Sequence, residues 1–310
     1  MPDAQIPPAP ISLNNVCKVY SNGFKAVNKV SFDIKKGEFT VLLGLNGAGK
    51  TSLISMITGL NHLSSGSIQI FGDEIATNPH AAKRHMGIMP QEVNFNQFNR
   101  IIDSLVFHGG YYGIPRDVVI QRAAPLLRKA NLLNKASQPV SSLSGGMKRI
   151  LMLIRALIQQ PKILILDEPT ANLDIQIRKT IWEILKEEHQ RGMTTLLTTH
   201  NLEEAQLLCT NVIILHHGKL MINQSIEDAI QSLEEKFYSI QFKHNITQKQ
   251  LDTFSAYQPQ KTAARKAVFC LLKSQDIGNL VYKLHLAELA IDNIAPSTHQ
   301  LEQLLHQATL

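Results

Sequence analysis

The feature that most constrains this chain is a glycine-rich loop between a predicted strand and a predicted helix. Eight consecutive residues match the pattern G-x-x-x-x-G-K-[ST] in full: Gly44, Leu45, Asn46, Gly47, Ala48, Gly49, Lys50 and Thr51. The apolar stretch F-T-V-L-L precedes them, and a segment with apolar residues at helical spacing follows. A surface turn that merely contained glycine and lysine would lack these flanks, so the context predicts a phosphate-binding loop in an α/β fold.

The chemistry of such a loop follows from its backbone. Glycines allow consecutive N–H groups to point inward as an anion nest, and the helix N-terminus adds partial positive charge. Lys50 can reach the β- and γ-phosphates, and the Thr51 hydroxyl can ligate Mg²⁺. Together with Ser52, the loop predicts a site for a nucleoside triphosphate and Mg²⁺. Kinases, G proteins, helicases and transport ATPases all use such a loop, so it does not identify the reaction.

A second apolar run supplies the carboxylates that such a site needs. The run I-L-I-L ends in Asp167 and Glu168, as a buried parallel strand that reaches the carboxyl edge of a sheet would. Asp167 is expected to hold Mg²⁺ through water. Glu168 points to the other side of a strand, so it is free to hold the attacking water as general base. Two solvated acids at a strand end are the alternative, which the phosphate loop disfavours.

A third motif decides between classes of nucleotide-binding protein. It is L-S-G-G-M, residues 143–147, which opens a predicted helix and begins 24 residues before Asp167. A loop with two glycines at a helix start is a second anion-binding N-terminus. One nucleotide has one γ-phosphate, which the phosphate loop already serves. The second loop is therefore predicted to serve a nucleotide held by another subunit.

The motif L-S-G-G-M resembles the L-S-G-G-Q signature of ABC-type ATPases, and further residues match that family's set in the expected order. Tyr20, 30 residues before Lys50, resembles the aromatic residue that stacks on adenine. Gln91 in M-P-Q resembles the glutamine that senses Mg²⁺ and the attacking water, and His200 resembles the switch histidine that contacts the γ-phosphate. The string A-N-L-D, ending at Asp174, resembles the loop that crosses the dimer interface.

The resemblance implies a role for each residue. Glu168, His200 and Gln91 would be catalytic, and Thr51, Gln91 and Asp167 would hold Mg²⁺. ATP would contact the phosphate loop, Ser52 and Tyr20 of one chain, and from its twin Ser144, Gly145, Gly146 and Asp174. Met147 departs from the family's glutamine. Because the γ-phosphate contacts should come from the serine and the glycine N–H groups, we expect hydrolysis to survive that change.

The resemblance also implies the fold, an α/β P-loop NTPase of the ABC type. It would have a mostly parallel core sheet, an antiparallel β subdomain, a helical insertion and a small C-terminal α+β domain. The expected divisions are a flexible leader at 1–10, a nucleotide-binding domain at 11–230 with its helical subdomain at about 92–160, and an accessory domain at 231–310. Within the insertion, Pro115 and Pro125 are expected to break the chain into short helices.

The function implied is ATP hydrolysis that powers a membrane exporter. Two chains would sandwich two ATP molecules, closing a homodimer beneath separate membrane-spanning subunits. Met147, the stretch P-Q-E-V-N-F-N and the C-terminal tail resemble bacterial exporter ATPases of the drug- and polysaccharide-export type. Such a chain would be cytoplasmic and peripheral on the inner face of the cell membrane through its partner. An importer subunit would carry the same ATPase site, so the direction of transport stays open.

Other features narrow the alternatives. The net charge of +6 permits a nucleic-acid partner without demanding one, and none is expected. A DNA-repair relative would carry a long coiled coil, but residues 51–143 leave room only for a short helical insertion. A translation-type relative would carry a second phosphate loop, and this sequence has one. The three cysteines are far apart, which disfavours disulfides and zinc sites. No run of 18 apolar residues and no signal-peptide pattern occurs, so neither a membrane span nor secretion is expected.

Two groups of residues have more than one interpretation. His216 and His217 are adjacent at a strand end, and because neighbouring strand residues point to opposite faces, a shared metal site is not expected. The aromatic residues after Gln91 either receive a helix of the membrane subunit or form the core of the insertion: Phe95, Phe98, Tyr111 and Tyr112.

Overall fold

The computed structural model describes residues 8–233, 235–272, 274–296 and 299–309. The chain divides into two units, one that ends at Gln224 and one that begins at Ser225. We expected the boundary at residue 231, so α8 (Ile226–Gln231) lies in the second unit instead of the first. Residues 1–7 of the expected leader lie outside the described residues. Among the described residues, no helix is long and apolar enough to cross a membrane.

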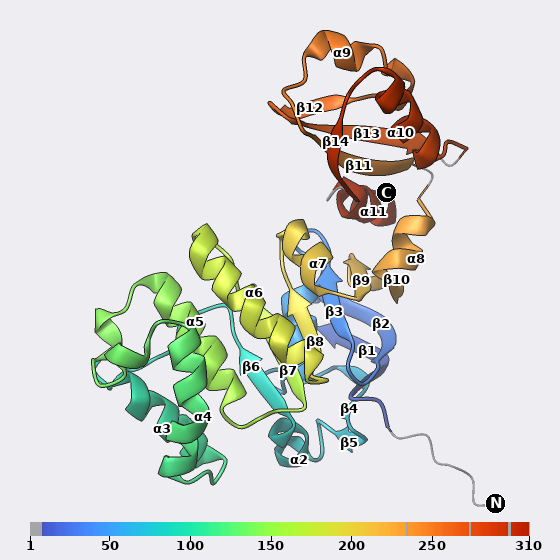
Figure 1. Ribbon diagram of the computed structural model, residues 1–310. Helices are drawn as coiled ribbons and strands as arrows, with labels where there is room; N and C mark the ends of the chain where they lie inside the picture. The colour runs from blue at the N-terminus through green and yellow to red at the C-terminus, as the bar shows by residue number, and fades with distance from the viewer. Residues whose placement is uncertain (1–7, 234, 273, 297–298, 310) are drawn as a thin grey trace, which may run out of the picture. The chain divides into compact units, whose positions relative to one another are not determined.

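The first unit is built on a six-stranded sheet in the order β10-β9-β3-β8-β7-β6 (Figure 1). Its strands are β3 (Phe39–Leu43), β6 (Met86–Met89), β7 (Ile163–Asp167), β8 (Thr194–Thr198), β9 (Asn211–His216) and β10 (Lys219–Ser225). The pairs β6–β7, β7–β8, β3–β8 and β3–β9 are parallel. Every residue of β3 and β8 is buried, which is typical of parallel strands covered on both faces.

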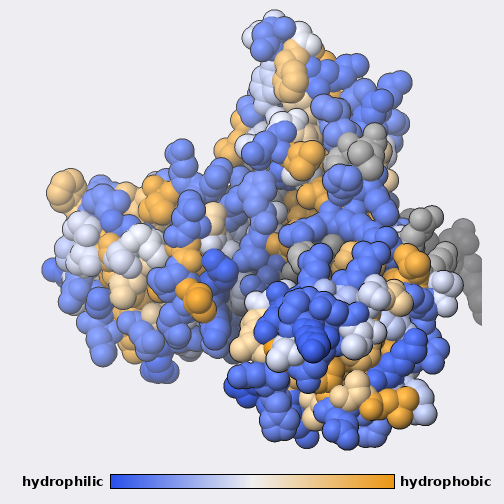
Figure 2. Space-filling view, turned by 90° about the horizontal axis from the view of Figure 1, so that it is seen from above, coloured by the Kyte–Doolittle hydropathy of each residue, from blue (hydrophilic) through white to orange (hydrophobic). Residues whose placement is uncertain are grey.

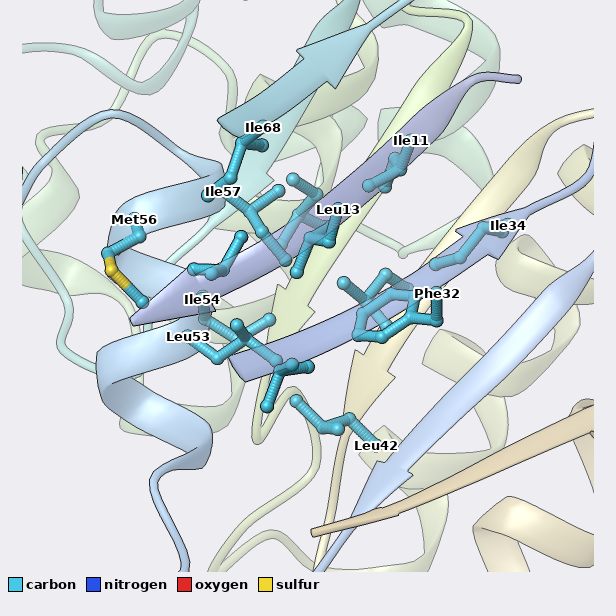
Figure 3. Close-up of a cluster of buried hydrophobic side chains, with 14 of the residues drawn as sticks. Ile11, Leu13, Phe32, Ile34, Leu42, Leu53, Ile54, Met56, Ile57 and Ile68 are labelled. Carbon is cyan, nitrogen blue, oxygen red and sulfur yellow. The ribbon is translucent and has the colours of Figure 1, made fainter. Parts of the chain in front are cut away.

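A second, antiparallel sheet of the same unit has the order β2-β1-β4-β5. Its strands are β1 (Ile11–Val19), β2 (Lys25–Ile34), β4 (Ser65–Ile70) and β5 (Asp73–Glu74). The helix α1 (Lys50–Ile57) packs between the two sheets, because its apolar residues share one core cluster with both. Figure 3 shows Leu53 and Ile54 of this helix beside Phe32 of β2 and Leu42 of β3.

The other helices of this unit include the expected insertion. They are α2 (Pro79–Arg84), α3 (Ile101–Tyr111), α4 (Arg116–Lys129), α5 (Gly145–Leu157), α6 (Ile175–Gln190) and α7 (Leu202–Leu208), with 3₁₀ turns η1 (Leu133–Lys135) and η2 (Val140–Ser142). Pro115 precedes α4 as expected, but the prediction that Pro125 breaks the helix is wrong. The buried face of Val119, Ala123 and Leu127 holds α4 together across the one hydrogen bond that Pro125 removes.

The second unit contains a four-stranded antiparallel sheet in the order β12-β13-β11-β14. Its elements are β11 (Glu235–Phe242), α9 (Gln248–Asp252), η3 (Ser255–Tyr257), β12 (Gln260–Ala263), β13 (Lys266–Leu272), α10 (Ile277–Leu286), β14 (Ile291–Pro296) and α11 (His299–Thr309). From β11 to β14 this is the β-α-β-β-α-β pattern of a split βαβ motif. The unit contains both helices and antiparallel strands, as expected for the small C-terminal α+β domain.

A buried acid joins two helices and a loop of the first unit. Glu204 on α7 is 0% exposed, and its Oε1 accepts hydrogen bonds from the Thr170 hydroxyl at 2.9 Å and the Trp182 indole N–H at 2.8 Å. Burial raises the pKa of the Glu204 carboxyl, and the hydrogen bonds from Thr199, Trp182 and Thr170 act in the opposite direction. The folded chain therefore binds this proton more tightly than the unfolded chain does.

We expect Glu204→Gln to become more stable relative to the parent protein as the pH rises. A raised folded-state pKa contributes stability that is complete below the unfolded-state pKa and is lost as the pH rises through the folded-state value. The glutamine amide of the variant keeps an oxygen acceptor for the hydrogen bonds. Because it does not titrate, the variant does not lose this stability as the pH rises. Urea unfolding of both proteins between about pH 5 and about pH 8 measures the gap in free energy of unfolding. The exposed neighbour Glu203→Gln is the control, and a gap that is constant with pH would contradict this assignment.

Candidate nucleotide-binding site

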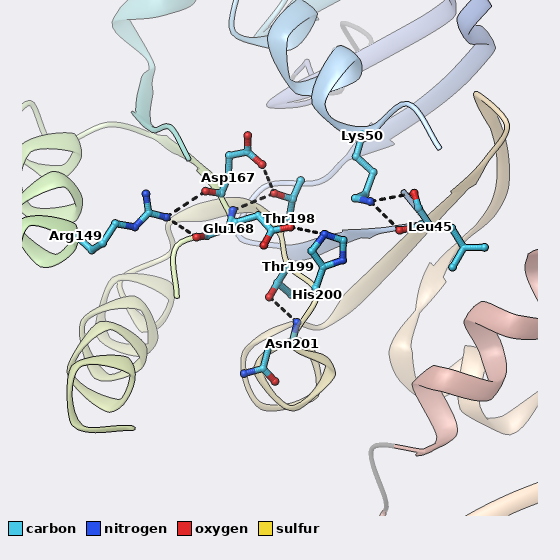
Figure 4. Close-up of polar contacts among 10 residues, drawn as sticks. Leu45, Lys50, Arg149, Asp167, Glu168, Thr198, Thr199, His200 and Asn201 are labelled. Atoms are coloured by element: carbon cyan, nitrogen blue, oxygen red, sulfur yellow. Dashed lines mark hydrogen bonds and ion pairs between the residues drawn. The ribbon is translucent and has the colours of Figure 1, made fainter. Parts of the chain in front are cut away.

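The glycine-rich loop turns sharply from β3 into α1. Gly49 caps α1 in a left-handed conformation, with φ of 102°. A Cβ atom at this position would lie 2.3 Å from the Ala26 carbonyl oxygen, so only glycine fits. The Lys50 ammonium lies over the loop and donates hydrogen bonds to the carbonyls of Gly44 at 2.7 Å and Leu45 at 3.3 Å (Figure 4). Burial lowers the pKa of Lys50, and the charges of Glu168 and Asp167 raise it.

The two acids lie at the carboxyl end of β7, as the sequence predicts. Asp167 Oδ1 accepts a hydrogen bond from the Thr198 hydroxyl at 2.5 Å. Glu168 has a left-handed φ of 51°, and its N–H donates to the Thr198 carbonyl at 3.0 Å. Its Oε1 lies 2.8 Å from His200 Nε2. The acids thus point to different partners, and Thr198, which sequence analysis missed, holds both.

These groups line one cleft of about 310 Å³. Its walls are Phe24, Ala26, Asn46, Gly47, Ala48, Gly49, Lys50, Thr51, Ser52, Gln91, Asp167, Glu168 and His200. Tyr20 lies next to the cleft, with its hydroxyl 3.0 Å from Ser52 Oγ. Sequence analysis missed Phe24, whose only signal is an exposed aromatic residue in a glycine-containing turn.

The remaining predicted site residues are not among those that line the cleft. Ser144 caps α5, where its hydroxyl accepts a hydrogen bond from the Met147 N–H at 3.3 Å. Asp174 caps α6 in the same way, accepting from the Ile177 N–H at 2.9 Å. Ser144 and Gly145 are exposed. The capped N-termini of α5 and α6 thus lie outside the set of residues that line this chain's own cleft.

The residues of the cleft fit a nucleoside triphosphate with Mg²⁺. The backbone of the loop approaches Ala26 too closely for any side chain at Gly49, which leaves the N–H groups at the start of α1 as the lining. Thr51, Gln91 and Asp167 offer hydroxyl, amide and carboxylate oxygens, the ligand types that Mg²⁺ prefers. Within the described part of the chain, no group of three or more His, Cys, Asp or Glu residues forms a separate metal site.

Comparison with known proteins supports this description. The family model described as ABC transporter matches residues 27–171. The Nod factor export ATP-binding protein I of Burkholderia orbicola is 40% identical over 72% of this chain and 73% of the relative. The protein of the same name from Cupriavidus pinatubonensis is 37% identical over 74% of this chain and 72% of the relative.

Solved structures agree with the predicted fold. The structure of an ATP-binding subunit of an ABC transporter is 29% identical, with a TM-score of 0.66 over 71% of this chain and 91% of that one. A dimeric bacterial ABC transporter cassette is 26% identical, with a TM-score of 0.62 over 70% of this chain and 98% of that one. The predictions of the ABC-type α/β fold and of ATPase activity are confirmed. The chain belongs to the ATP-binding subunits of ABC transporters and is an ATPase.

Proposed function

We propose that this chain is the ATP-hydrolysing subunit of a membrane exporter and acts as a homodimer beneath separate membrane-spanning subunits. The observation that carries the proposal is the division of the site. The phosphate loop, Glu168 and His200 share one cleft, while the capped loops at Ser144 and Asp174 lie outside it. The curated relatives are named for export, which favours an exporter over an importer. The chain would be peripheral on the cytoplasmic face of the membrane.

Hydrolysis would use the cleft as follows. The N–H groups at the start of α1 and the Lys50 ammonium bind the β- and γ-phosphates. Glu168 accepts a proton from the attacking water as the water oxygen bonds to the γ-phosphorus and the bond to the ADP oxygen breaks. His200, 2.8 Å from Glu168, holds the carboxylate toward the cleft. Mg²⁺ held by Thr51, Gln91 and Asp167 would neutralise charge on the phosphate oxygens.

We expect Lys50→Ala to lower ATP hydrolysis at least about a hundredfold and to weaken nucleotide binding, because the variant loses the ammonium that lies over the loop. Phosphate release and binding of a fluorescent ATP analogue measure the two effects. Lys83→Ala on α2, whose ammonium contacts the Gly59 carbonyl, is the matched control. Normal turnover by Lys50→Ala would rule out the role of this lysine.

We expect Glu168→Gln to hydrolyse ATP about 10²–10⁴ times more slowly, as the loss of a general base requires, and to retain ATP binding. Since ATP would then persist between the two chains, the variant should accumulate as a dimer in ATP and Mg²⁺. Light scattering after size-exclusion chromatography measures the mass. The double variant Glu168→Gln/Ser144→Arg is the control, because a bulky cation in the exposed serine loop should block closure while ATP still binds. A Glu168→Gln protein that stays monomeric would contradict the sandwich.

The surface for the membrane subunit is expected on the helical insertion. Phe98 is 89% exposed and Tyr111 is 88% exposed, so neither forms the core of the insertion. Phe95 instead stacks against Arg155, whose Cζ lies 4.5 Å from the centroid of the Phe95 ring. Tyr112 packs on the ring of His108. The face in Figure 2 shows hydrophobic residues in small groups among hydrophilic ones. A docking site of this kind would be local and would use a few exposed aromatic residues.

We expect Phe98→Asp to fold normally and to lose co-purification with its membrane subunits. An exposed site usually changes the free energy of unfolding by no more than about 0.5 kcal/mol, whereas a charge would be costly inside an apolar groove. Thermal unfolding and affinity purification from the native host check both points. Tyr282→Asp on α10, at a site 62% exposed, is the control. A Phe98→Asp protein that folds and still co-purifies with its membrane subunits would contradict a docking role for this residue.

A further inference from the structure

Arg149 is a buried cation that the catalytic roles above do not use. It lies on α5, four residues after Gly145, and is 6% exposed. Its guanidinium donates hydrogen bonds to five backbone carbonyls: Pro90 at 3.0 Å, Pro169 at 3.3 Å, Asp167 at 3.4 Å, and also Gln91 and Glu168. Figure 4 shows the bonds to the carbonyls of Asp167 and Glu168. One side chain therefore joins α5 to the segments that follow β6 and β7.

Only arginine can make this set of contacts. Its planar guanidinium presents five N–H donors in a fixed fork, whereas lysine offers a single point charge. Burial lowers the pKa of Arg149, and the charges of Asp167 and Glu168 raise it. The group nevertheless stays protonated in a protein, so its charge must be satisfied by these carbonyls. Loss of the fork would leave several part-buried carbonyls without their donor.

Arg149, which we call the clamp, and the serine–glycine loop at Ser144 and Gly145 belong to one helix, α5. Four residues of α-helix span about 6 Å, so Arg149 lies one turn from the helix N-terminus that Ser144 caps. A displacement of that N-terminus carries the guanidinium with it. The guanidinium in turn holds the backbone of Gln91, a predicted Mg²⁺ ligand, and of Glu168, the proposed base.

We propose that Arg149 is a positioning residue that couples the two nucleotide sites of the homodimer. When the serine–glycine loop of one chain closes on the nucleotide held by its twin, α5 moves the backbone of that same chain's Gln91 and Glu168 into position for hydrolysis. Each site thus responds to the occupancy of the other. This inference rests on the proposed homodimer, and it predicts hydrolysis that is cooperative in ATP, with a Hill coefficient between one and two.

The test uses Arg149→Lys, which keeps the charge, and Arg149→Met, which keeps an unbranched stem but has neither the charge nor the N–H donors. For both we expect kcat to fall about tenfold or more, as a misplaced catalytic group requires, while the affinity of the monomer for a fluorescent ATP analogue stays unchanged. The Hill coefficient should fall to about one. Arg149→Lys should retain more activity than Arg149→Met.

Arg155→Met is the matched control on the same helix. The Arg155 side chain is half-buried, and its guanidinium donates a hydrogen bond to Asn94 Oδ1 at 2.6 Å and stacks on Phe95, beyond Gln91. We expect this variant to keep the Hill coefficient of the parent protein. Loss of cooperativity in Arg155→Met as severe as in Arg149→Lys would overturn the assignment to Arg149.

The outcomes separate this inference from the proposed function. If the parent protein is cooperative and the Arg149 variants fold with the same Hill coefficient and kcat, the coupling role is wrong and the homodimer stands. If Glu168→Gln does not dimerise with ATP, the proposed function itself fails.

Hydrogen exchange on the unaltered chain decides the case if the Arg149 variants do not fold. A saturating non-hydrolysable ATP analogue is held constant while the protein concentration is raised through dimerisation. Amide exchange in residues 143–149, 88–92 and 165–170 should then slow together. Slowing confined to residues 143–149 would overturn the coupling.

Discussion

The parallel pairing of the core strands is the constraint on which the site depends. Because β3, β6, β7 and β8 run in one direction, their carboxyl ends meet at one edge of the sheet. The register pairs Asp167 with Thr198, which places the threonine hydroxyl on the carboxylate. A slip of one residue would turn each side chain to the opposite face. The buried, apolar character of these strands therefore fixes the geometry of the polar groups that follow them.

Site residues were predictable where a motif is contiguous. The phosphate loop contains its turn, its nest and its helix start within a few residues, so local spacing is enough to identify it. Thr198 and Arg149 were not predictable in this way. Thr198 matters because the register of β7 and β8 brings it to Asp167. Arg149 matters because α5 packs against the segments that follow β6 and β7. Such roles arise from tertiary packing, which the spacing of a single segment does not encode.

The fold was predictable to a similar degree. The helix that follows L-S-G-G-M, α5, and the apolar strand that ends in Asp167, β7, appear where they were expected. Pro125 does not break α4, because the packing of the helix's buried face outweighs the one hydrogen bond that the proline removes. In the second unit, β12 has four exposed residues and no alternation of apolar and polar residues, so its sequence does not predict a strand. Its pairing with β13 supplies the structure instead.

Glu204 and Arg149 are both buried near the site, but they differ in whether a change of pH can remove their charge. Glu204 can give up its charge, since protonation leaves a neutral acid that still accepts from Thr170 and Trp182. Arg149 has no such option, and its hydrogen bonds persist at any pH at which the protein is folded. A clamp that cannot be switched off by protonation can change only if the helix that bears it moves. In the proposed homodimer, the group that moves α5 would act at the exposed N-terminus of this helix, at Ser144 and Gly145.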